Sequence, residues 1–379
     1  MVSYLESPAY RRIVVKLGTN VLTAGTERLD LEVMAALVGQ MARLHQAGLE
    51  LIVISSGAIA AGRHKLGLIR ESKGVPFRQV LASVGQSRLM QAYDQLFSRH
   101  GITVAQTLLT KADLSDRLGY LNARNTLLAL LELGVISIVN ENDVVAVEEL
   151  EGTTFGDNDN LSAMVANLVD ADLLVLLTDI DGLYTADPHR DASAELICRV
   201  DRIDAEIERL AGGPDGIGGR GTGGMATKVE AARLATTSGV AVVISSGREP
   251  DVLVRLTAGE AIGTFFPACT TKLESRKRWM LSGLACCGSL VVDAGAVTAL
   301  REHNSSLLPA GITEVEGEFG RGDIVDIFDS RGEKIACGIS NYSSRDIAII
   351  KGLHSDKIQE LLGYEYGAEV VHRNNLVVL

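Results

Sequence analysis

The stretch Arg12–Asn20, RIVVKLGTN, is decisive for the fold because it joins a buried strand to a polar turn. The run Ile13–Val15 is continuously β-branched, which is typical of parallel strands that are buried on both faces. The strand ends in Lys16, and Gly18 and Thr19 form a turn directly after it. A lysine and turn N–H groups at this end of a strand can bind a phosphate. The alternative is a solvated lysine beside an ordinary turn.

Buried runs of the same kind recur up to about residue 265, separated by segments whose apolar residues repeat at helical spacing. This alternation predicts a parallel sheet with helices on both faces and with ligands at the carboxyl ends of the strands. The other predicted strands are Leu51–Ile54, Ile102–Ala105, Val135–Val139, Leu173–Leu177 and Val240–Ile244. The predicted helices are Leu29–Leu44, Tyr120–Leu133 and Met225–Ser238.

The composition argues against several classes of protein. A length of 379 residues predicts two or three domains. A net charge of −12 argues against a general nucleic-acid binder or a membrane-surface protein. No apolar run approaches the roughly 18 residues of a transmembrane helix, and the first residues lack a signal-peptide pattern. The five cysteines form no CxxC pair and the seven histidines lack metal-ligand spacing, so we expect a reduced, cytoplasmic protein without metal-ligating residues of its own.

The pattern of the sequence changes near residue 270. The segment Lys272–Met280 is basic and holds the single tryptophan of the chain. From Gly288 onward short apolar runs alternate with glycine-containing turns, as in a small β-barrel or sandwich. The sequence therefore predicts a first domain over residues 1–268, a linker over 269–285 and a second domain over 286–379.

Four polar clusters follow predicted strands in the first domain, and a fifth, glycine-rich cluster leads into the predicted helix at Met225. Each cluster alone fits an ordinary helix cap or a flexible linker. Together they supply two lysines, several carboxylates and glycine-rich backbone, with no nucleophile–base pair, which favours phosphoryl transfer by positioning and charge stabilisation. The clusters are Val15–Asn20, Ser55–Ala58, Asn140–Asp143 with Gly156–Asn160 a loop later, Thr178–Pro188 and Gly212–Lys228.

Six motifs in these clusters resemble the amino-acid kinase superfamily and stand in that family's order. They are VKLGTN, ISSGAIAAGR, NENDVVAV, FGDNDNLSA, LLTDIDGLYTADP and GTGGMATK, within about residues 12–265. The resemblance implies an α/β fold, a three-layer sandwich with a mainly parallel central sheet. The segments Ser305–Gly311, Phe319–Asp323 and Gly338–Ser344 resemble a PUA domain, which implies that the second domain is small and β-barrel-like.

The resemblance also implies an activity. The closest motif matches are to the branch of the family that uses ATP with Mg²⁺ to phosphorylate the γ-carboxylate of L-glutamate. The product, γ-glutamyl phosphate, begins proline biosynthesis, so feedback inhibition by proline is implied as well. Because an acyl phosphate is labile, a partner glutamyl-phosphate reductase is implied, with channelling of the product to it. Family members are homo-oligomers, either dimers or tetramers.

Site residues follow from the same resemblance, position by position. The implied catalytic residues are Lys16, Asp159 and Lys228. The implied ATP- and phosphate-binding residues are Lys16, Gly18, Thr19, Thr178, Asp179, Thr222, Gly223, Gly224, Met225, Ala226, Thr227 and Lys228. The implied substrate-binding residues are Ser56, Asp143 and Asn158.

Two alternatives remain at this point. PUA domains are mostly known as RNA-binding modules, so the chain could be an RNA-binding protein whose kinase-like domain senses a ligand. Residues 285–379 hold 8 Lys and Arg against 14 Asp and Glu, which makes RNA binding a poor fit because RNA affinity depends on phosphate neutralisation. The narrower alternative is a sister kinase that acts on another acyl acceptor. A sensor has no need of the complete set Lys16, Asp159 and Lys228.

Overall fold

The computed structural model describes residues 10–67, 74–146, 158–188, 190–212, 224–272, 287–303 and 305–379. The chain divides into two compact units. The first comprises Met1–Leu114 and Ala123–Lys272, and the second comprises Ser115–Asn122 and Leu273–Leu379. Most of the predicted linker lies outside the described residues. Among the helices that are described, none is both long enough and apolar enough to cross a membrane.

The first unit is built on a seven-stranded sheet in the order β3-β4-β2-β1-β5-β6-β7. The first six strands in the chain pair in parallel, and β7 runs antiparallel to β6. This confirms the predicted mainly parallel sheet and puts the decisive strand β1 in its centre. The strands are β1 (Arg12–Leu17), β2 (Glu50–Ser55), β3 (Val104–Leu109), β4 (Ile136–Glu141), β5 (Leu173–Thr178), β6 (Ala241–Ser246) and β7 (Thr264–Phe266).

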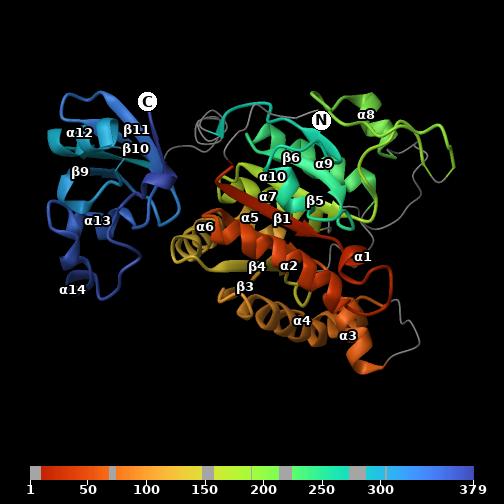
Figure 1. Cartoon of the computed structure of the whole chain (residues 1–379). Helices are drawn as coiled ribbons and strands as arrows, with labels where there is room; N and C mark the ends of the chain where they lie inside the picture. Colours follow the sequence, from red (N-terminus) through yellow and green to blue (C-terminus); the bar gives the residue numbers. More distant parts are fainter. Residues whose placement is uncertain are drawn as a thin grey trace. The chain divides into compact units, whose positions relative to one another are not determined.

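Helices cover both faces of this sheet, so the unit has three layers (Figure 1). On one face α2, α4 and α10 share a core with Ile13, Val15 and Leu17 of β1. On the other face α7 and α9 pack against the strands and against each other. The helices that lie wholly in this unit are α1 (Thr19–Leu22), α2 (Leu31–Gln46), α3 (Ala58–Leu66), α4 (Val75–Ser98), α7 (Asn158–Leu168), α8 (Ala205–Leu210), α9 (Met225–Thr237) and α10 (Val252–Thr257), whereas α5 (Lys111–Ser115) and α6 (Arg117–Glu132) have residues in both units.

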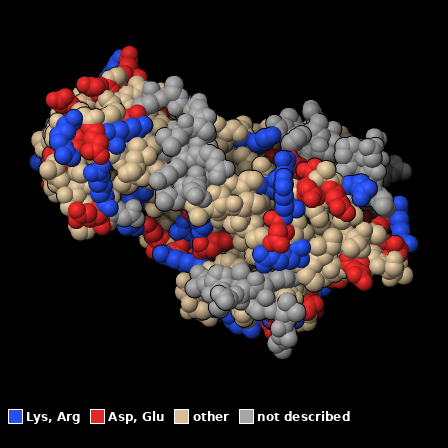
Figure 2. Space-filling view, turned by 90° about the horizontal axis from the view of Figure 1, so that it is seen from above, with Lys and Arg blue, Asp and Glu red and all other residues tan. Residues whose placement is uncertain are grey.

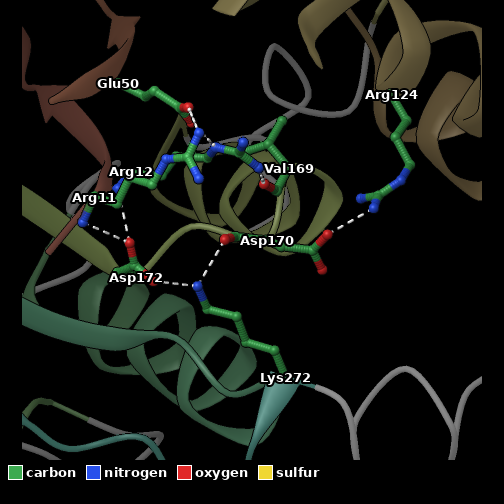
Figure 3. A network of polar contacts seen from close by, with 8 residues as sticks. All are labelled: Arg11, Arg12, Glu50, Arg124, Val169, Asp170, Asp172 and Lys272. Atoms are coloured by element: carbon green, nitrogen blue, oxygen red, sulfur yellow. Dashed lines mark hydrogen bonds and ion pairs between the residues drawn. The ribbon is translucent and has the colours of Figure 1, made fainter. Parts of the chain in front are cut away.

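A polar network fixes the amino ends of the central strands (Figure 3). One carboxylate oxygen of Asp172 accepts hydrogen bonds from the backbone N–H groups of Arg11 and Arg12, at 2.8 and 2.7 Å. The other oxygen pairs with the ammonium group of Lys272. The Arg12 side chain donates to Glu50, at 2.6 Å. Charged groups therefore tie β1, β2 and β5 together at the edge opposite their polar turns.

Two glycines let α3 and α4 touch backbone to backbone. A Cβ atom at Gly85 would lie 1.7 Å from the carbonyl oxygen of Ala58, and one at Gly62 would lie 1.9 Å from that of Leu81. No side chain fits at either position, since real Cβ atoms do not approach oxygen so closely. The crossing holds α4 against the first turn of α3, directly after the turn that follows β2.

The second unit is organised around a five-stranded sheet in the order β12-β11-β10-β8-β9. All its pairs are antiparallel except β10 with β8. Its strands are β8 (Gly288–Val292), β9 (Ile312–Gly317), β10 (Ile324–Asp329), β11 (Lys334–Ile339) and β12 (Leu376–Val378). Its helices are α12 (Ala294–His303), α13 (Ser344–Ile350) and α14 (Ile358–Leu362), with short 3₁₀ turns at Pro309–Gly311, Ser355–Lys357 and Arg373–Asn375. The unit has an apolar core of its own.

The close contact of α3 and α4 at Gly62 and Gly85 can be tested by substitution. Replacing Gly85 by Ala forces α3 and α4 apart, so we expect the free energy of unfolding to fall by about 3 kcal/mol or more. The matched control is Gly39→Ala in α2, where an added Cβ meets nothing within 4 Å. That change should raise the free energy of unfolding by up to about 1 kcal/mol, because alanine favours a helix. Urea unfolding measures both, and equal stability of the two variants would contradict the crossing.

Candidate active site

A buried carboxylate between two buried lysines forms the centre of the candidate site. Asp159 Oδ1 forms an ion pair with Lys16 Nζ, and Asp159 Oδ2 lies 3.2 Å from Lys228 Nζ. Thr227 Oγ1 lies 2.9 Å from the same Oδ2 atom. The exposed fractions are 0% for Asp159, 3% for Lys16 and 5% for Lys228. The structure thus brings together the three residues that the sequence implied as catalytic.

Three elements position these groups. Lys16 lies on β1 and, in the alternation of that strand, faces away from the core that Val15 and Leu17 share with α2 and α4. Asp159 lies in the first turn of α7, and Lys228 lies in the first turn of α9. Both helices pack on the second face of the sheet and against each other. Their amino-terminal turns meet the carboxyl end of β1, where a parallel sheet binds its ligands.

The surroundings of Asp159 keep it ionised. Burial by itself would raise the pKa of its carboxyl group. The ammonium groups of Lys16 and Lys228, with hydrogen bonds from Lys16 and Thr227, outweigh the burial and hold the pKa well below its usual range. With one carboxylate between two lysines, the centre retains positive charge, and it is suited to an anion.

The turn after β1 lies against Lys16. The N–H group of Gly18 donates to the carbonyl oxygen of Leu177 on β5, at 3.2 Å. A Cβ atom at Gly18 would lie 3.9 Å from Lys16 Nζ, so the backbone passes close to the ammonium group. Thr19 is exposed and begins α1. The predicted phosphate-binding turn therefore adjoins the lysine, with the Gly18 amide engaged in joining β1 to β5.

A second polar group follows β5. Thr178 ends this strand, and its hydroxyl group donates to Asp179 Oδ1, at 3.1 Å. Asn20 Nδ2 donates to Asp179 Oδ2, at 2.8 Å. Burial opposes ionisation of Asp179, but these hydrogen bonds, its own N–H group and the charge of Lys228 lower its pKa. The sequence analysis assigned no role to Asn20. Its side chain links the first predicted cluster, Val15–Asn20, to the fourth, Thr178–Pro188.

The start of α9 holds the last of the predicted nucleotide residues. Gly224 precedes the helix in an extended conformation, and Met225 and Ala226 form its first residues. Gly224 and Ala226 are exposed, whereas Thr227 and Lys228 are buried. The predicted residues Thr222 and Gly223 lie outside the described residues.

The predicted substrate residues lie at the ends of β2 and β4 and at the start of α7. Asn158 Nδ2 donates to Ser56 Oγ, at 3.0 Å, and to Asn140 Oδ1, at 3.1 Å. Asn140 donates in turn to Gln86 Oε1, at 2.9 Å. All four side chains are at least nine-tenths buried. The structure brings Ser56 and Asn158 together and adds two residues that received no role in the sequence analysis.

Asp143 lies in the turn after β4 and is half-buried. Burial and the neighbouring carboxylate of Glu141 raise its pKa to about 6, and Arg78 lowers it in part. A carboxylate with a raised pKa gains most from a cationic partner, because such a partner relieves both the burial and the repulsion.

Of the two added residues, Asn140 stands in the NEND motif, where its position at the carboxyl end of a buried strand is a usable signal. Gln86 lies in the middle of α4 and has no local signal. Within the described ranges, no group of three or more His, Cys, Asp or Glu side chains is arranged to hold a metal ion.

Comparisons with known proteins identify the family of this chain. The model of the Amino acid kinase family matches residues 11–246, and that of the PUA domain matches residues 288–362. A glutamate 5-kinase of Dehalococcoides mccartyi is 60% identical over 375 residues, which cover 99% of this chain and 100% of the relative. Glutamate 5-kinases of Herpetosiphon aurantiacus and Shewanella oneidensis are each 52% identical, over 98% and 99% of this chain and 100% of each relative. The chain therefore belongs to the amino acid kinase family, in the group that carries a C-terminal PUA domain.

Proposed function

We propose that this protein is a glutamate 5-kinase, which transfers the γ-phosphoryl group of ATP to the γ-carboxylate of L-glutamate in the first step of proline biosynthesis. The observation that carries the proposal is the Asp159 carboxylate between Lys16 and Lys228 at the ligand-binding edge of the sheet. The names of relatives at 52–60% identity over nearly the whole chain support the choice of substrate.

The reaction needs charge stabilisation and no general base. A γ-carboxylate oxygen attacks the γ-phosphorus of ATP, a new P–O bond forms, and the bond to the β,γ-bridging oxygen breaks to release ADP. The nucleophile is already ionised at neutral pH, so no proton is transferred. The barrier comes from bringing two anions together and from charge that develops on the transferred group.

The lysines answer that need. Lys16 and Lys228 offset the negative charge of the transferring group, and Asp159 holds both ammonium groups in place. Mg²⁺ that enters with ATP would supply further charge neutralisation. Thr19 would contact phosphate oxygens, and Gly18, whose amide donates to Leu177, would let the backbone pass close to them. Thr178, Asp179 and the segment 222–228 would contact the nucleotide, with the amino terminus of α9 toward the phosphates.

The amino acid would be recognised by its free ammonium group. The carboxylate of Asp143 is the proposed partner of that ammonium, and Ser56 and Asn158 supply neutral polar contacts. An N-acetylated acid lacks the charge and would leave Asp143 unpaired, at a cost of about 1–3 kcal/mol. L-Proline also carries an ammonium and a carboxylate, so we propose that it competes for this site.

The remaining roles are proposals from family membership and chemistry. The acyl phosphate hydrolyses readily, so we propose that a glutamyl-phosphate reductase consumes it, with channelling between the two enzymes. We also propose a cytoplasmic homo-oligomer, and light scattering would test the dimer or tetramer. RNA binding by the PUA domain is disfavoured by the acidic charge of residues 285–379. On the face in Figure 2, Lys and Arg side chains lie among Asp and Glu side chains.

Trapping the product tests the proposed reaction. Hydroxylamine converts an acyl phosphate to a hydroxamate, so the protein is incubated with Mg²⁺·ATP, hydroxylamine and one acid at a time. We expect hydroxamate from L-glutamate, suppressed by L-proline, and none from N-acetylglutamate or L-aspartate. Preference for either of the other acids would favour a sister kinase. No product from any acid would refute a carboxylate kinase and favour a ligand sensor.

Lys228→Met tests the role of the second lysine. The variant loses one ammonium from the site of developing charge, so we expect kcat to fall by about 100-fold or more. Lys65→Met, which makes the same change at an exposed position of α3, is the matched control and should leave kcat unaltered. Circular dichroism checks that both variants are folded. Near-normal turnover in a folded Lys228→Met protein would remove this residue from the mechanism.

The raised pKa of Asp143 predicts a pH dependence. The ionised form, which dominates above a pKa of about 6, is the one that pairs with the substrate ammonium. As the pH falls through that value, kcat/KM for L-glutamate should fall, by about tenfold between pH 7 and pH 5. Asp143→Asn should lower kcat/KM and lose this inflection. If the inflection persists in the variant, another group is responsible for it.

A further inference from the structure

The side-chain amides of Gln86, Asn140 and Asn158 form a relay of hydrogen bonds beside the proposed glutamate site. One backbone N–H group determines the direction of these hydrogen bonds. The N–H group of Glu141 donates to Asn140 Oδ1, at 2.9 Å. A backbone N–H can only donate, so Oδ1 must face it, and the amino group of Asn140 must point the other way. That amino group donates to Gln86 Oε1, at 2.9 Å. The side-chain amide of Gln86 therefore presents its oxygen to the relay.

The orientation of the Asn158 side-chain amide is determined in the same way. Its amino group donates to Asn140 Oδ1 and to Ser56 Oγ, at 3.1 and 3.0 Å. The carbonyl oxygen of Asn158 is then left as a buried acceptor that has no hydrogen-bond partner among the described residues. A buried acceptor of this kind fits a ligand that brings a donor, and the substrate ammonium is such a donor.

Helix α4 contacts the ends of β2 and β4, beside which these polar groups lie. Gln86 follows Gly85, the residue whose missing side chain lets α4 touch the backbone of Ala58. Two turns farther along the same helix, the hydroxyl group of Tyr93 lies 2.8 Å from Ser55 Oγ at the end of β2. One helix thus makes buried hydrogen bonds to the ends of β2 and β4, beside the proposed substrate residues.

We propose that Gln86 is a positioning residue of the glutamate site, which holds Asn140 and, through it, presents the carbonyl oxygen of Asn158 to the substrate ammonium. The inference rests on the proposed function and adds a residue for recognising the amino group. Without the Gln86 acceptor, the amino group of Asn140 is buried without a partner, and the amide can turn to find another. Asn158 then loses its fixed orientation.

The test compares L-glutamate with glutarate, which has the same two carboxylates and no ammonium group. For Gln86→Met we expect KM for L-glutamate to rise at least about tenfold, whereas the inhibition constant of glutarate and KM for ATP change less than about twofold. The ratio of the two acid constants is independent of the folded fraction, because both are measured on the same sample. Gln86→Glu keeps an acceptor at this position and should restore most of the discrimination.

The control is Gln95→Met, the same change at an exposed position of α4, which should leave every constant unchanged. An unchanged KM for L-glutamate in Gln86→Met overturns the proposal. A parallel rise in the glutamate and glutarate constants overturns it too, because it shows a merely structural role. Failure of the wild-type protein to phosphorylate L-glutamate is a separate result, which refutes the proposed function itself.

Discussion

The carboxylate of Asp159 is the interaction on which the candidate site depends. It neutralises part of the charge of Lys16 and Lys228, which allows two ammonium groups to be buried close together. Without it, the lysines would repel each other in a poorly solvated site. With the carboxylate in place, Lys16 from β1 and Lys228 from α9 both point toward Asp159. Burying a cluster of ions lowers the stability of the protein, because the charged groups lose their hydration. We interpret the cluster as an arrangement that binds a second anion, which enters the site from solution.

The topology explains how distant segments contribute to this one cluster. Because β1 lies between β2 and β5, its carboxyl end adjoins the turns that hold Ser56 and Thr178. The charged network around Asp172 fixes the opposite ends of the same strands. The glycine contact between α3 and α4 then adds a supporting layer on the other face of the sheet, from which Gln86 reaches the end of β4.

Regular patterns of apolar residues predicted the bounds of several strands and helices closely. The run before Lys16 predicted β1 to within one residue, and the helix expected over Leu29–Leu44 lies at Leu31–Gln46. The strand expected at Ile102–Ala105 lies at Val104–Leu109, because pairing with β4 extends it through two polar residues. Gln86 could not be predicted, since its role arises from a helix crossing and a partner far away in the chain. The raised pKa of Asp143 likewise depends on burial that no local pattern reveals.

The most direct test of the central claim is the free energy of unfolding of two variants, measured by urea denaturation. Asp159→Asn leaves two buried ammonium groups without their carboxylate and should lose about 3 kcal/mol or more. Adding Lys16→Met and Lys228→Met to that variant removes the unpaired charges, so the triple variant should regain most of the loss. If Asp159→Asn is as stable as the wild type, or if the triple variant is less stable than Asp159→Asn, the carboxylate does not hold the two lysines.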